Sequence, residues 1–467
     1  MNIASSNRLL WVLWLLLSSI LVTYFAHAMF SATDKTVFMP GPLSAGHHQL
    51  AQSCESCHTD SLGGGEVLQA SCESCHGDVR VKPFDSHPVA KFEDPRNADL
   101  LLKVNVTQCV SCHTEHKPEI TIKDGLTQPL DVCYHCHSDV GENRPSHKDM
   151  SFMTCKDAGC HNFHNNRALY TDFLIKHMDA LPINQDGRVP EREFASIIDQ
   201  LLEYPRDLYP LETLDKAAAD MPLSVAAANA ITEDWHQSSH AQAGVNCSAC
   251  HQAADESGQP TAWIDKPGTD GCASCHGVEV QRFGLGKHGM RLAAGLSPMT
   301  PAQAQLSMSP DVAHQELTCS SCHGAHQFDV EQAAVESCLS CHTDDHSLAY
   351  KKSSHYQLWL AEIGGDGAVG SGVSCATCHM PRIDFDVDDY VSRKMVDHNQ
   401  SATLSPNSKM IRPACLACHG LPFAIDAMAD RELIERNFQG RPTVHVQSVD
   451  LARQEQERHE RERAERK

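Results

Sequence analysis

A five-residue pattern, Cys, two variable residues, Cys and then His, recurs ten times along this chain of 467 residues. It uses 20 of the 22 cysteines; the other two, Cys155 and Cys160, also precede a histidine but have four residues between them. Every cysteine therefore belongs to a pair that a histidine follows. The pairs are Cys54 and Cys57, Cys72 and Cys75, Cys109 and Cys112, Cys133 and Cys136, Cys155 and Cys160, Cys247 and Cys250, Cys272 and Cys275, Cys319 and Cys322, Cys338 and Cys341, Cys375 and Cys378, and Cys415 and Cys418.

Cys-x-x-Cys-His is the attachment sequence of c-type haem. The two thiols bond to two vinyl groups on one edge of the porphyrin, and the histidine lies beneath the iron as its first axial ligand. Disulfides and zinc are alternatives, but zinc takes four Cys or His ligands and needs no His after every second Cys. The sequence thus predicts eleven covalently attached haem c groups, with a disulfide as the alternative at Cys155 and Cys160. The predicted first axial ligands are His58, His76, His113, His137, His161, His251, His276, His323, His342, His379 and His419.

This number of haems limits what the chain can fold into. Shared among eleven haems, 467 residues leave about 42 for each, too few for an ordinary apolar core around every one. We expect a mainly α fold with extensive loops and little β structure, in which polypeptide wraps around stacked haems.

Histidines outside the motifs are numerous enough to give every iron a second axial ligand. Iron with two histidine ligands is six-coordinate, which suits electron transfer rather than substrate binding. Four candidates, His116, His164, His326 and His346, stand three or four residues behind a motif histidine, on the same side of their own haem. We expect these four to reach a neighbouring haem, with a surface position as the alternative. The other candidates are His47, His48, His87, His147, His236, His240, His288, His314, His355 and His398.

The first thirty residues have the pattern of an export signal or a membrane anchor. Arg8 precedes an apolar run from Leu9 to Phe25, and Ala26-His27-Ala28 resembles a cleavage site. The run is slightly longer than the core of a cleaved signal, so we favour an uncleaved transmembrane helix over residues 1–30, with cleavage as the alternative. Either way, the rest of the chain faces the periplasm or the exterior.

The formal net charge of −22 excludes some partners and favours others. Nucleic acid is not expected to bind, because a duplex requires a basic surface. Each haem adds two propionates, so we expect a basic docking partner and an association that weakens with salt.

The motifs form two clusters on either side of a haem-free stretch. We predict a pentahaem module at 31–166, a helical spacer at 167–232, a hexahaem module at 233–420 and a charged tail at 421–467. The spacer has apolar residues at helical spacing around a sequence, Pro182 to Glu193, that resembles an EF-hand loop. Pro182 stands where the first aspartate ligand of such a loop belongs, so we favour a loop that binds no calcium.

Two family resemblances add to these predictions. Residues 40–166 resemble the class III cytochromes c, small multihaem carriers, in their closely spaced motifs, the His47-His48 pair and the longer Cys155–Cys160 spacing. Residues 233–420 are loosely similar to C-terminal parts of multihaem nitrite reductases and hydroxylamine oxidoreductases, in "CHTDDHSLAYKKSSHYQLW" and "CATCHMPR". The second likeness implies one open iron with catalytic side chains nearby, although the motif lysine of pentahaem nitrite reductases is absent. Candidates for those side chains are Tyr350, Lys351, Lys352, His355 and Arg382.

Two main functions are consistent with this sequence. We favour an electron conduit that takes electrons from a membrane-bound quinol-oxidising donor or another cytochrome and passes them to a periplasmic or outer-surface acceptor. Its expected location is the periplasmic side of the inner membrane, held by the N-terminal anchor, with secretion to the periplasm or cell surface as the alternative. The alternative function is an oxidoreductase that acts on a small nitrogen or sulfur species at one open haem, and a haem filament is a third possibility.

Overall fold

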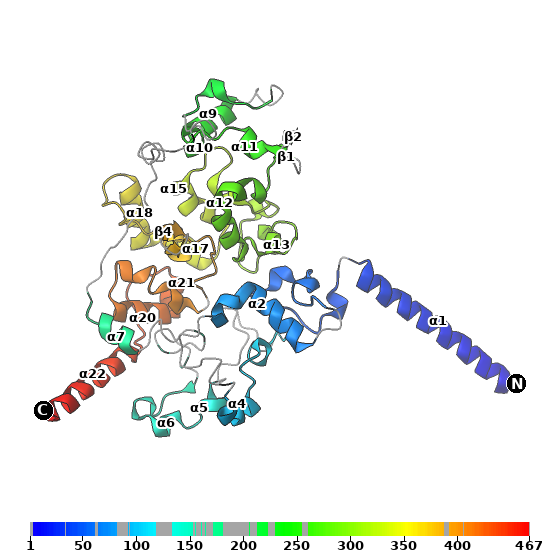
Figure 1. Cartoon of the computed structure of the whole chain (residues 1–467), viewed down its shortest axis with the longest axis horizontal. Helices are drawn as coiled ribbons and strands as arrows, with labels where there is room; N and C mark the ends of the chain where they lie inside the picture. The colour runs from blue at the N-terminus through cyan, green and yellow to red at the C-terminus, as the bar shows by residue number, and fades with distance from the viewer. Residues whose placement is uncertain are drawn as a thin grey trace. The chain divides into compact units, whose positions relative to one another are not determined.

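The computed structural model describes residues 3–32, 34–60, 64–81, 92, 94–117, 133–152, 155, 160, 164, 171–180, 205, 213–222, 229–254, 260–386, 392–404 and 406–466. Within these ranges the chain consists mainly of short helices joined by loops, with little strand (Figure 1). The expectation of a mainly α fold with extensive loops is therefore confirmed.

The N-terminal helix α1 covers Ile3–Phe30. Its segment Asn7–Phe30 is long and apolar enough to cross a membrane, a test that a secretion signal also passes. The helix ends where the backbone amides of Ser31 and Ala32 donate to the carbonyl oxygen of His27. The apolar helix that the sequence predicts at the N-terminus is thus present.

The chain divides into two compact units, Met1–Val81 with Val89–His135 and Lys82–Pro88 with Cys136–Lys467. The division falls inside one cysteine motif, within the predicted pentahaem module, and the module boundaries stay a prediction. The elements up to the division are α1, η1 (Thr36–Phe38), η2 (His48–Leu50), η3 (Cys54–Ser56), α2 (Gly65–Val81), η4 (Pro95–Asn97), α4 (Ala98–Lys103), η5 (Cys109–Ser111) and α5 (Tyr134–His137), which the division crosses.

The second unit holds the remaining helices and two short hairpins. Its helices before the first hairpin are α6 (Val140–Asn143), η6 (Pro145–His147), α7 (Thr171–His177), η9 (Lys216–Ala218), α9 (Asn229–Gln237), α10 (Ser239–Gln242) and α11 (Ser248–His251). Between the hairpins lie α12 (Thr269–Gly284), α13 (Met290–Ala293), η10 (Pro301–Gln303), η11 (Pro310–Val312), α14 (Cys319–His323), α15 (Val330–Ala334), α16 (Glu336–Leu339), α17 (Asp345–Ala349), η12 (Tyr350–Lys352), α18 (Ser354–Ile363) and α19 (Cys375–His379). After the second hairpin come η13 (Asn407–Met410), η14 (Cys415–Ala417), α20 (Leu421–Ala429), α21 (Arg431–Glu435) and α22 (Ser448–Glu465).

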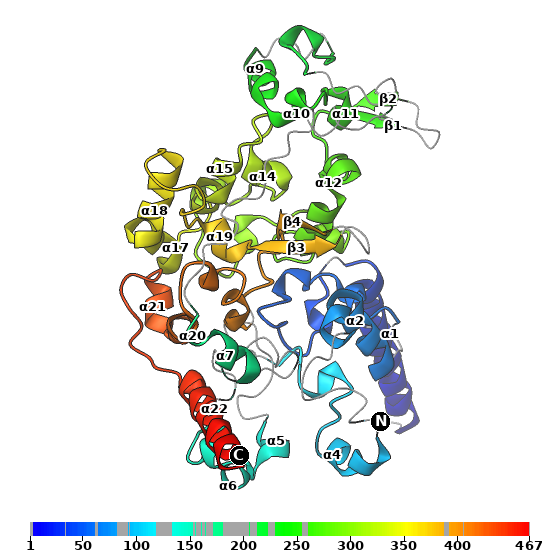
Figure 2. The ribbon, with the colours of Figure 1, turned by 60° about the vertical axis from the view of Figure 1, so that its left-hand side comes forward.

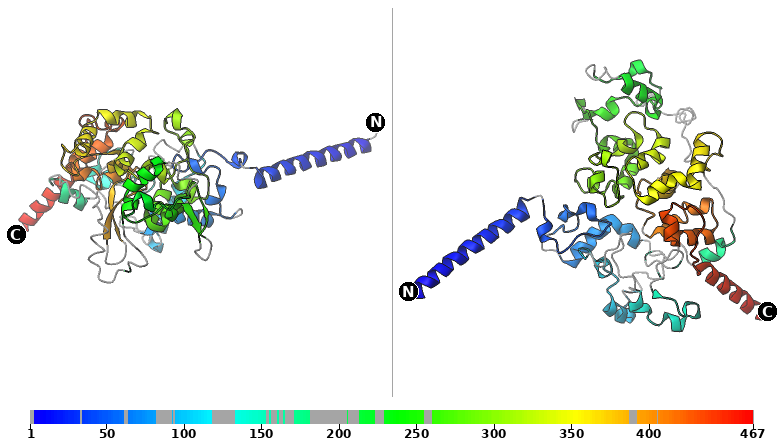
Figure 3. Two further views of the ribbon diagram at one scale, coloured as in Figure 1. Left: turned by 90° about the horizontal axis from the view of Figure 1, so that it is seen from above. Right: turned by 180° about the vertical axis from the view of Figure 1, so that it is seen from behind.

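The two hairpins are antiparallel and two-stranded. Strand β1 (Gln252–Ala254) pairs with β2 (Pro260–Trp263) directly after one motif. Strand β3 (Arg382–Asp386) pairs with β4 (Ser392–Val396) directly after another (Figures 2 and 3). The hairpins therefore support the ends of motifs and build no larger sheet within the described residues.

The Cys-x-x-Cys-His motifs within the described residues form helical turns. In two examples the backbone amide of the histidine donates to the carbonyl oxygen of the first cysteine: His58 to Cys54 and His419 to Cys415, both at 2.8 Å. Positions i, i+3 and i+4 lie on one face of such a turn. Both thiols and the imidazole therefore project to the same side, as attachment to one porphyrin edge requires.

An apolar core lies in the second unit where α7, α20 and α22 meet. Leu421 and Ile425 are almost completely buried in it, and the first turn of α22 contributes Val449. Cys378 and Cys415 pack against the same core, so it supports the last two motifs. These helices include part of residues 421–467, where the sequence suggested a charged tail.

Asp430 is the N-cap of α21 and is buried. Its carboxylate accepts hydrogen bonds from the Thr443 backbone amide (2.7 Å), the Thr443 hydroxyl (2.9 Å) and the Leu433 backbone amide (3.0 Å). The bonds from Thr443 and Leu433 hold the pKa of Asp430 below its ordinary value.

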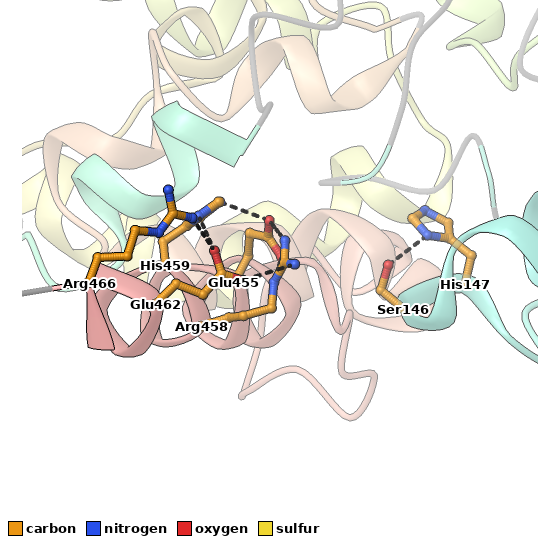
Figure 4. Close-up of polar contacts among 7 residues, drawn as sticks. All are labelled: Ser146, His147, Glu455, Arg458, His459, Glu462 and Arg466. Carbon is orange, nitrogen blue, oxygen red and sulfur yellow. Dashed lines mark hydrogen bonds and ion pairs between the residues drawn. The ribbon is translucent and has the colours of Figure 1, made fainter. Parts of the chain in front are cut away.

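The outer part of α22 is polar and carries ion pairs within the helix (Figure 4). Glu455 contacts both Arg458 and His459, and Glu462 contacts Arg458 and Arg466. Exposed pairs at this spacing each contribute only about 0.3–0.5 kcal/mol. The exposed end of α22 therefore adds little to the stability of the core at its base.

Candidate haem-binding sites

Within the described residues, seven motif histidines lie opposite a second histidine ring, with ring centres 5.8 to 6.3 Å apart. In every one of these pairs the second histidine lies outside the motifs. The pairs are His76 with His47 (6.0 Å), His251 with His326 (5.8 Å), His276 with His240 (6.1 Å), His323 with His398 (6.3 Å), His342 with His288 (6.2 Å), His379 with His346 (6.2 Å) and His419 with His355 (6.1 Å).

The separation fits one iron ion between two imidazoles. An imidazole nitrogen lies about 2 Å from a first-row metal, so the centres of two rings on opposite sides of it are roughly 6 Å apart. Ordinary aromatic pairs span a similar range, but they would not select one motif and one non-motif histidine each time. The repeated combination is therefore the feature that points to axial ligation.

The paired histidines cover the second cluster completely. All six motifs between Cys247 and His419 have a partner ring. In the first cluster the structure brings together His76 and His47. The first cluster also includes residues 118–132 and 161–163, which lie outside the described ranges.

Two of the histidines close behind a motif face a different motif. His326 follows His323 by three residues but faces His251, and His346 follows His342 by four but faces His379. The backbone of His326 is left-handed, with φ of 72°, an uncommon conformation for a residue with a Cβ. Both rings thus lie near the histidine of another motif, and their ligation of a neighbouring haem stays a prediction.

The outer ring nitrogens of several candidate ligands donate to backbone carbonyl oxygens. His251 Nδ1 donates to Ile264 (2.7 Å) and His398 Nδ1 to Val396 (3.0 Å). A bond at Nδ1 fixes the ring orientation and leaves Nε2 directed at the metal position. His116, which shares the left-handed backbone with φ of 60°, donates from Nδ1 in the same way, to Gly41 (3.0 Å).

Burial keeps the deepest of these imidazoles neutral. Burial is the main cause that lowers the pKa of His379 to about 4, and the nearby His346 and His342 rings add to it. Burial likewise lowers the pKa of His288 to about 4. A neutral imidazole is the form that binds a metal, so both side chains are ready to act as ligands at neutral pH.

From Cys247 onward, thiols of consecutive motifs lie close to one another in the second unit. The neighbouring thiols are Cys250 with Cys272, Cys272 with Cys319, Cys322 with Cys338, Cys338 with Cys375, and Cys378 with Cys415. The first unit repeats this arrangement between its first three motifs, through Cys57 with Cys75 and Cys72 with Cys109. Within each of these two runs, the first three motifs and the six from Cys247 to Cys418, motifs that are consecutive in the sequence are therefore neighbours in space.

Glu115 is a charged residue beside these histidines that the sequence alone did not indicate. It accepts a hydrogen bond from His47 Nδ1 at 2.8 Å. Burial by itself would raise the pKa of Glu115, but hydrogen bonds from His47 and Ser44 outweigh it and hold the pKa at about 2. Its only mark in the sequence is its place directly before His116 in "CHTEH".

The remaining predicted second ligands have other contacts, are exposed, or lie outside the described residues. His147 Nδ1 lies 3.0 Å from the Ser146 hydroxyl (Figure 4), and His236 Nδ1 donates to the Leu214 carbonyl oxygen at 3.3 Å. His314 is exposed. The other three are His48, whose Nδ1 donates to the Ala45 carbonyl oxygen at 3.3 Å, His164, which is exposed, and His87, which lies outside the described residues.

The five candidate catalytic residues have different surroundings in the structure. The Tyr350 hydroxyl donates to the backbone carbonyl oxygen of Val373 at 2.8 Å. Lys351 and Lys352 are exposed, and Glu336 lies 3.5 Å from Lys351. His355 lies opposite His419, as described above. Arg382 begins β3, where it pairs with Val396. The Tyr350 and His355 side chains are thus engaged within the fold, and both lysines are at the surface.

Two predicted sites fall largely outside the described residues. Cys155 and Cys160 are half-buried, but the residues between them and His161 lie outside. The EF-hand-like sequence, Pro182 to Glu193, also lies outside. The haem on Cys155 and Cys160 and the absence of calcium therefore stay predictions.

Comparison with known proteins supports the assignment of the first cluster as a multihaem cytochrome region. Residues 46–138 match the family model described as Cytochrome c3, a multihaem family with covalently attached haem c. No solved structure matches the chain. The matched residues end before the second cluster, so the likeness to nitrite reductases and hydroxylamine oxidoreductases stays a prediction. Over residues 46–138, the likeness to the multihaem class III cytochromes c is confirmed.

Proposed function

We propose that this protein is an undecahaem c-type cytochrome that conducts electrons through haems with two histidine ligands. The observation that carries the proposal is the set of seven ring pairs, each of one motif and one non-motif histidine about 6 Å apart. An iron with both axial positions taken exchanges electrons without binding a substrate.

The chain's own residues hold and orient the group. The cysteine pairs would hold the porphyrin covalently, and the motif histidine and its partner would bind the iron. Bound haem supplies the one-electron chemistry of iron. Backbone carbonyl oxygens at the outer ring nitrogens, as at His251 and His398, keep each imidazole in the orientation and tautomer that ligation needs.

The order of the motifs supports a linear route in the second unit. Each of the six motifs from Cys247 to Cys418 has a thiol near a thiol of the next motif, from Cys250 at one end to Cys415 at the other. We propose that electrons follow this order between the haem on Cys247 and Cys250 and the haem on Cys415 and Cys418.

The N-terminal helix and the charge suggest where the conduit works. We propose that Asn7–Phe30 anchors the chain in the inner membrane, with both units on the periplasmic side. A membrane-bound quinol-oxidising enzyme or another cytochrome would then supply electrons. The net charge of −22 favours a basic docking partner, whose association weakens as salt is added.

Ligand binding and turnover by the full-length protein in detergent test this function. We expect the reduced protein to bind no carbon monoxide and to show no turnover of nitrite, hydroxylamine or tetrathionate, while every haem is reduced and reoxidised reversibly. The His355→Ala variant is the positive control, since it removes the ring opposite His419 and should bind carbon monoxide. Turnover of any of these substrates by the wild-type protein would overturn the conduit in favour of an enzyme.

A further inference from the structure

His47 differs from the other paired histidines in what its outer ring nitrogen contacts. His47 Nδ1 donates to the Glu115 carboxylate at 2.8 Å. Among the other paired histidines of the described chain, His251, His346 and His398 donate from Nδ1 to backbone carbonyl oxygens. The acceptor at the outer nitrogen of His47 is therefore a negatively charged carboxylate, whereas the acceptors at His251, His346 and His398 are neutral carbonyl groups.

The carboxylate of Glu115 is fixed in place by a second residue. Its Oε1 also accepts from the Ser44 hydroxyl at 2.8 Å, and its Oε2 accepts from the Ser44 backbone amide at 2.7 Å. Ser44 is almost completely buried, so these bonds are shielded from water. Ser44 thus holds the Glu115 carboxylate in one defined position relative to His47, which follows Ser44 by three residues.

Asp344, a second carboxylate near a candidate axial ligand, does not repeat this arrangement. Asp344 Oδ2 lies 3.6 Å from His342 Nδ1, beyond hydrogen-bonding distance. Asp344 instead caps α17 by accepting from the Ser347 amide (3.1 Å) and hydroxyl (2.8 Å). Within the described residues, Glu115 is therefore the carboxylate that hydrogen-bonds directly to a candidate axial ligand.

A carboxylate on the outer nitrogen changes the electronics of the metal. It draws the Nδ1 proton toward itself and makes Nε2 a stronger electron donor, which stabilises the ferric over the ferrous state. The negative charge, held in a partly buried site, acts in the same direction because reduction adds an electron nearby. Both effects lower the midpoint potential of the haem concerned.

We propose that Glu115 is a positioning residue that orients His47 toward His76 and lowers the midpoint potential of the haem on Cys72 and Cys75. The inference rests on the proposed function, because it takes His47 and His76 as the axial ligands of that haem. Glu115 lies two residues after His113, so the segment that carries the third motif also tunes the ligand of the second.

The test is a potentiometric titration of the full-length protein and its Glu115→Gln variant, followed by optical and EPR spectra. Glutamine keeps the acceptor oxygen and removes the charge. We expect one midpoint potential to move upward, the others to keep their values, and all haems to stay low-spin. Glu66→Gln is the matched control, since Glu66 is exposed in the first turn of α2 in the same unit, outside any motif, and should leave the potentials unchanged.

A double variant shows whether the shift passes through His47. Methionine at position 47 is a possible axial ligand that has no ring N–H, so Glu115→Gln should shift the potential less in a His47→Met background than in the wild type. An equal shift in both backgrounds, or no shift at all, overturns the inference. If all haems are low-spin and reducible in that case, the proposed function stands; a high-spin wild-type haem would defeat the function itself.

Discussion

Replacing His326 with alanine should open the iron of one particular haem. His326 directly follows the motif of Cys319 and Cys322, yet its ring lies opposite His251. The haem that loses a ligand is therefore predicted to be the one on Cys247 and Cys250. A model in which each histidine serves its own motif predicts the other haem.

The size of the change follows from the geometry. The two ring centres are 5.8 Å apart with one metal position between them, and an alanine side chain ends at Cβ, far short of that position. One iron in eleven should thus become high-spin, and the reduced variant should bind about one carbon monoxide per chain. The other ten haems should stay low-spin, because each uses different ligands.

The assay is EPR spin quantification with a carbon monoxide titration. His314→Ala is the matched control, since His314 is exposed and should leave the spectra unchanged. The triple variant His326→Ala, Cys247→Ala, Cys250→Ala lacks the affected haem, so the high-spin signal should disappear. Persistence of that signal in the triple variant, or a fully low-spin His326→Ala protein, would refute the pairing.

Four further predictions concern stability and haem content. Leu421→Ala should destabilise the second unit by about 2–5 kcal/mol in denaturant unfolding, because its side chain is fully buried; a loss below about 1 kcal/mol would contradict the packing. Removing residues 455–467 should change stability by less than about 1 kcal/mol, since their ion pairs are exposed; a larger loss would show unrecognised contacts. The carboxylate of Asp430 stabilises the fold above its unfolded-state pKa, and this contribution is lost as the pH falls through the lowered folded-state pKa. Wild-type stability should therefore fall more steeply below about pH 4 than that of Asp430→Asn, and parallel curves would contradict the assignment. Replacing both Cys155 and Cys160 with alanine should remove the mass of one haem from the intact protein, whereas an unchanged mass would favour a disulfide there.

The shape of the Cys-x-x-Cys-His turn could be predicted from the sequence, because it depends only on residues that are adjacent in the chain. Two cysteines and a histidine at positions i, i+3 and i+4 share a helical face whatever surrounds them. The ring opposite each motif depends on the tertiary fold: His326 and His251 are far apart in sequence and meet only after folding. The sequence indicated which histidines could be second ligands and that some would reach a neighbouring haem. It did not indicate which motif histidine each of them would face.

Other features were missed for identifiable reasons. His288 was among the candidate second ligands, but its place opposite His342 could not be predicted, because it depends on the tertiary fold. The apolar spacing of Leu421–Ala429 would have indicated a buried helix, but the charged residues beyond it drew attention to a tail. Glu115 had no periodicity or motif of its own, since its role depends on Ser44 and His47, which lie far from it in sequence.

The most direct test of the central claim is a spin count of the iron in the oxidised wild-type protein, measured by EPR against its total haem. If both axial positions of every haem are taken by histidine, all eleven irons should be low-spin. A high-spin signal that accounts for one iron per chain or more would show an open haem and contradict the account.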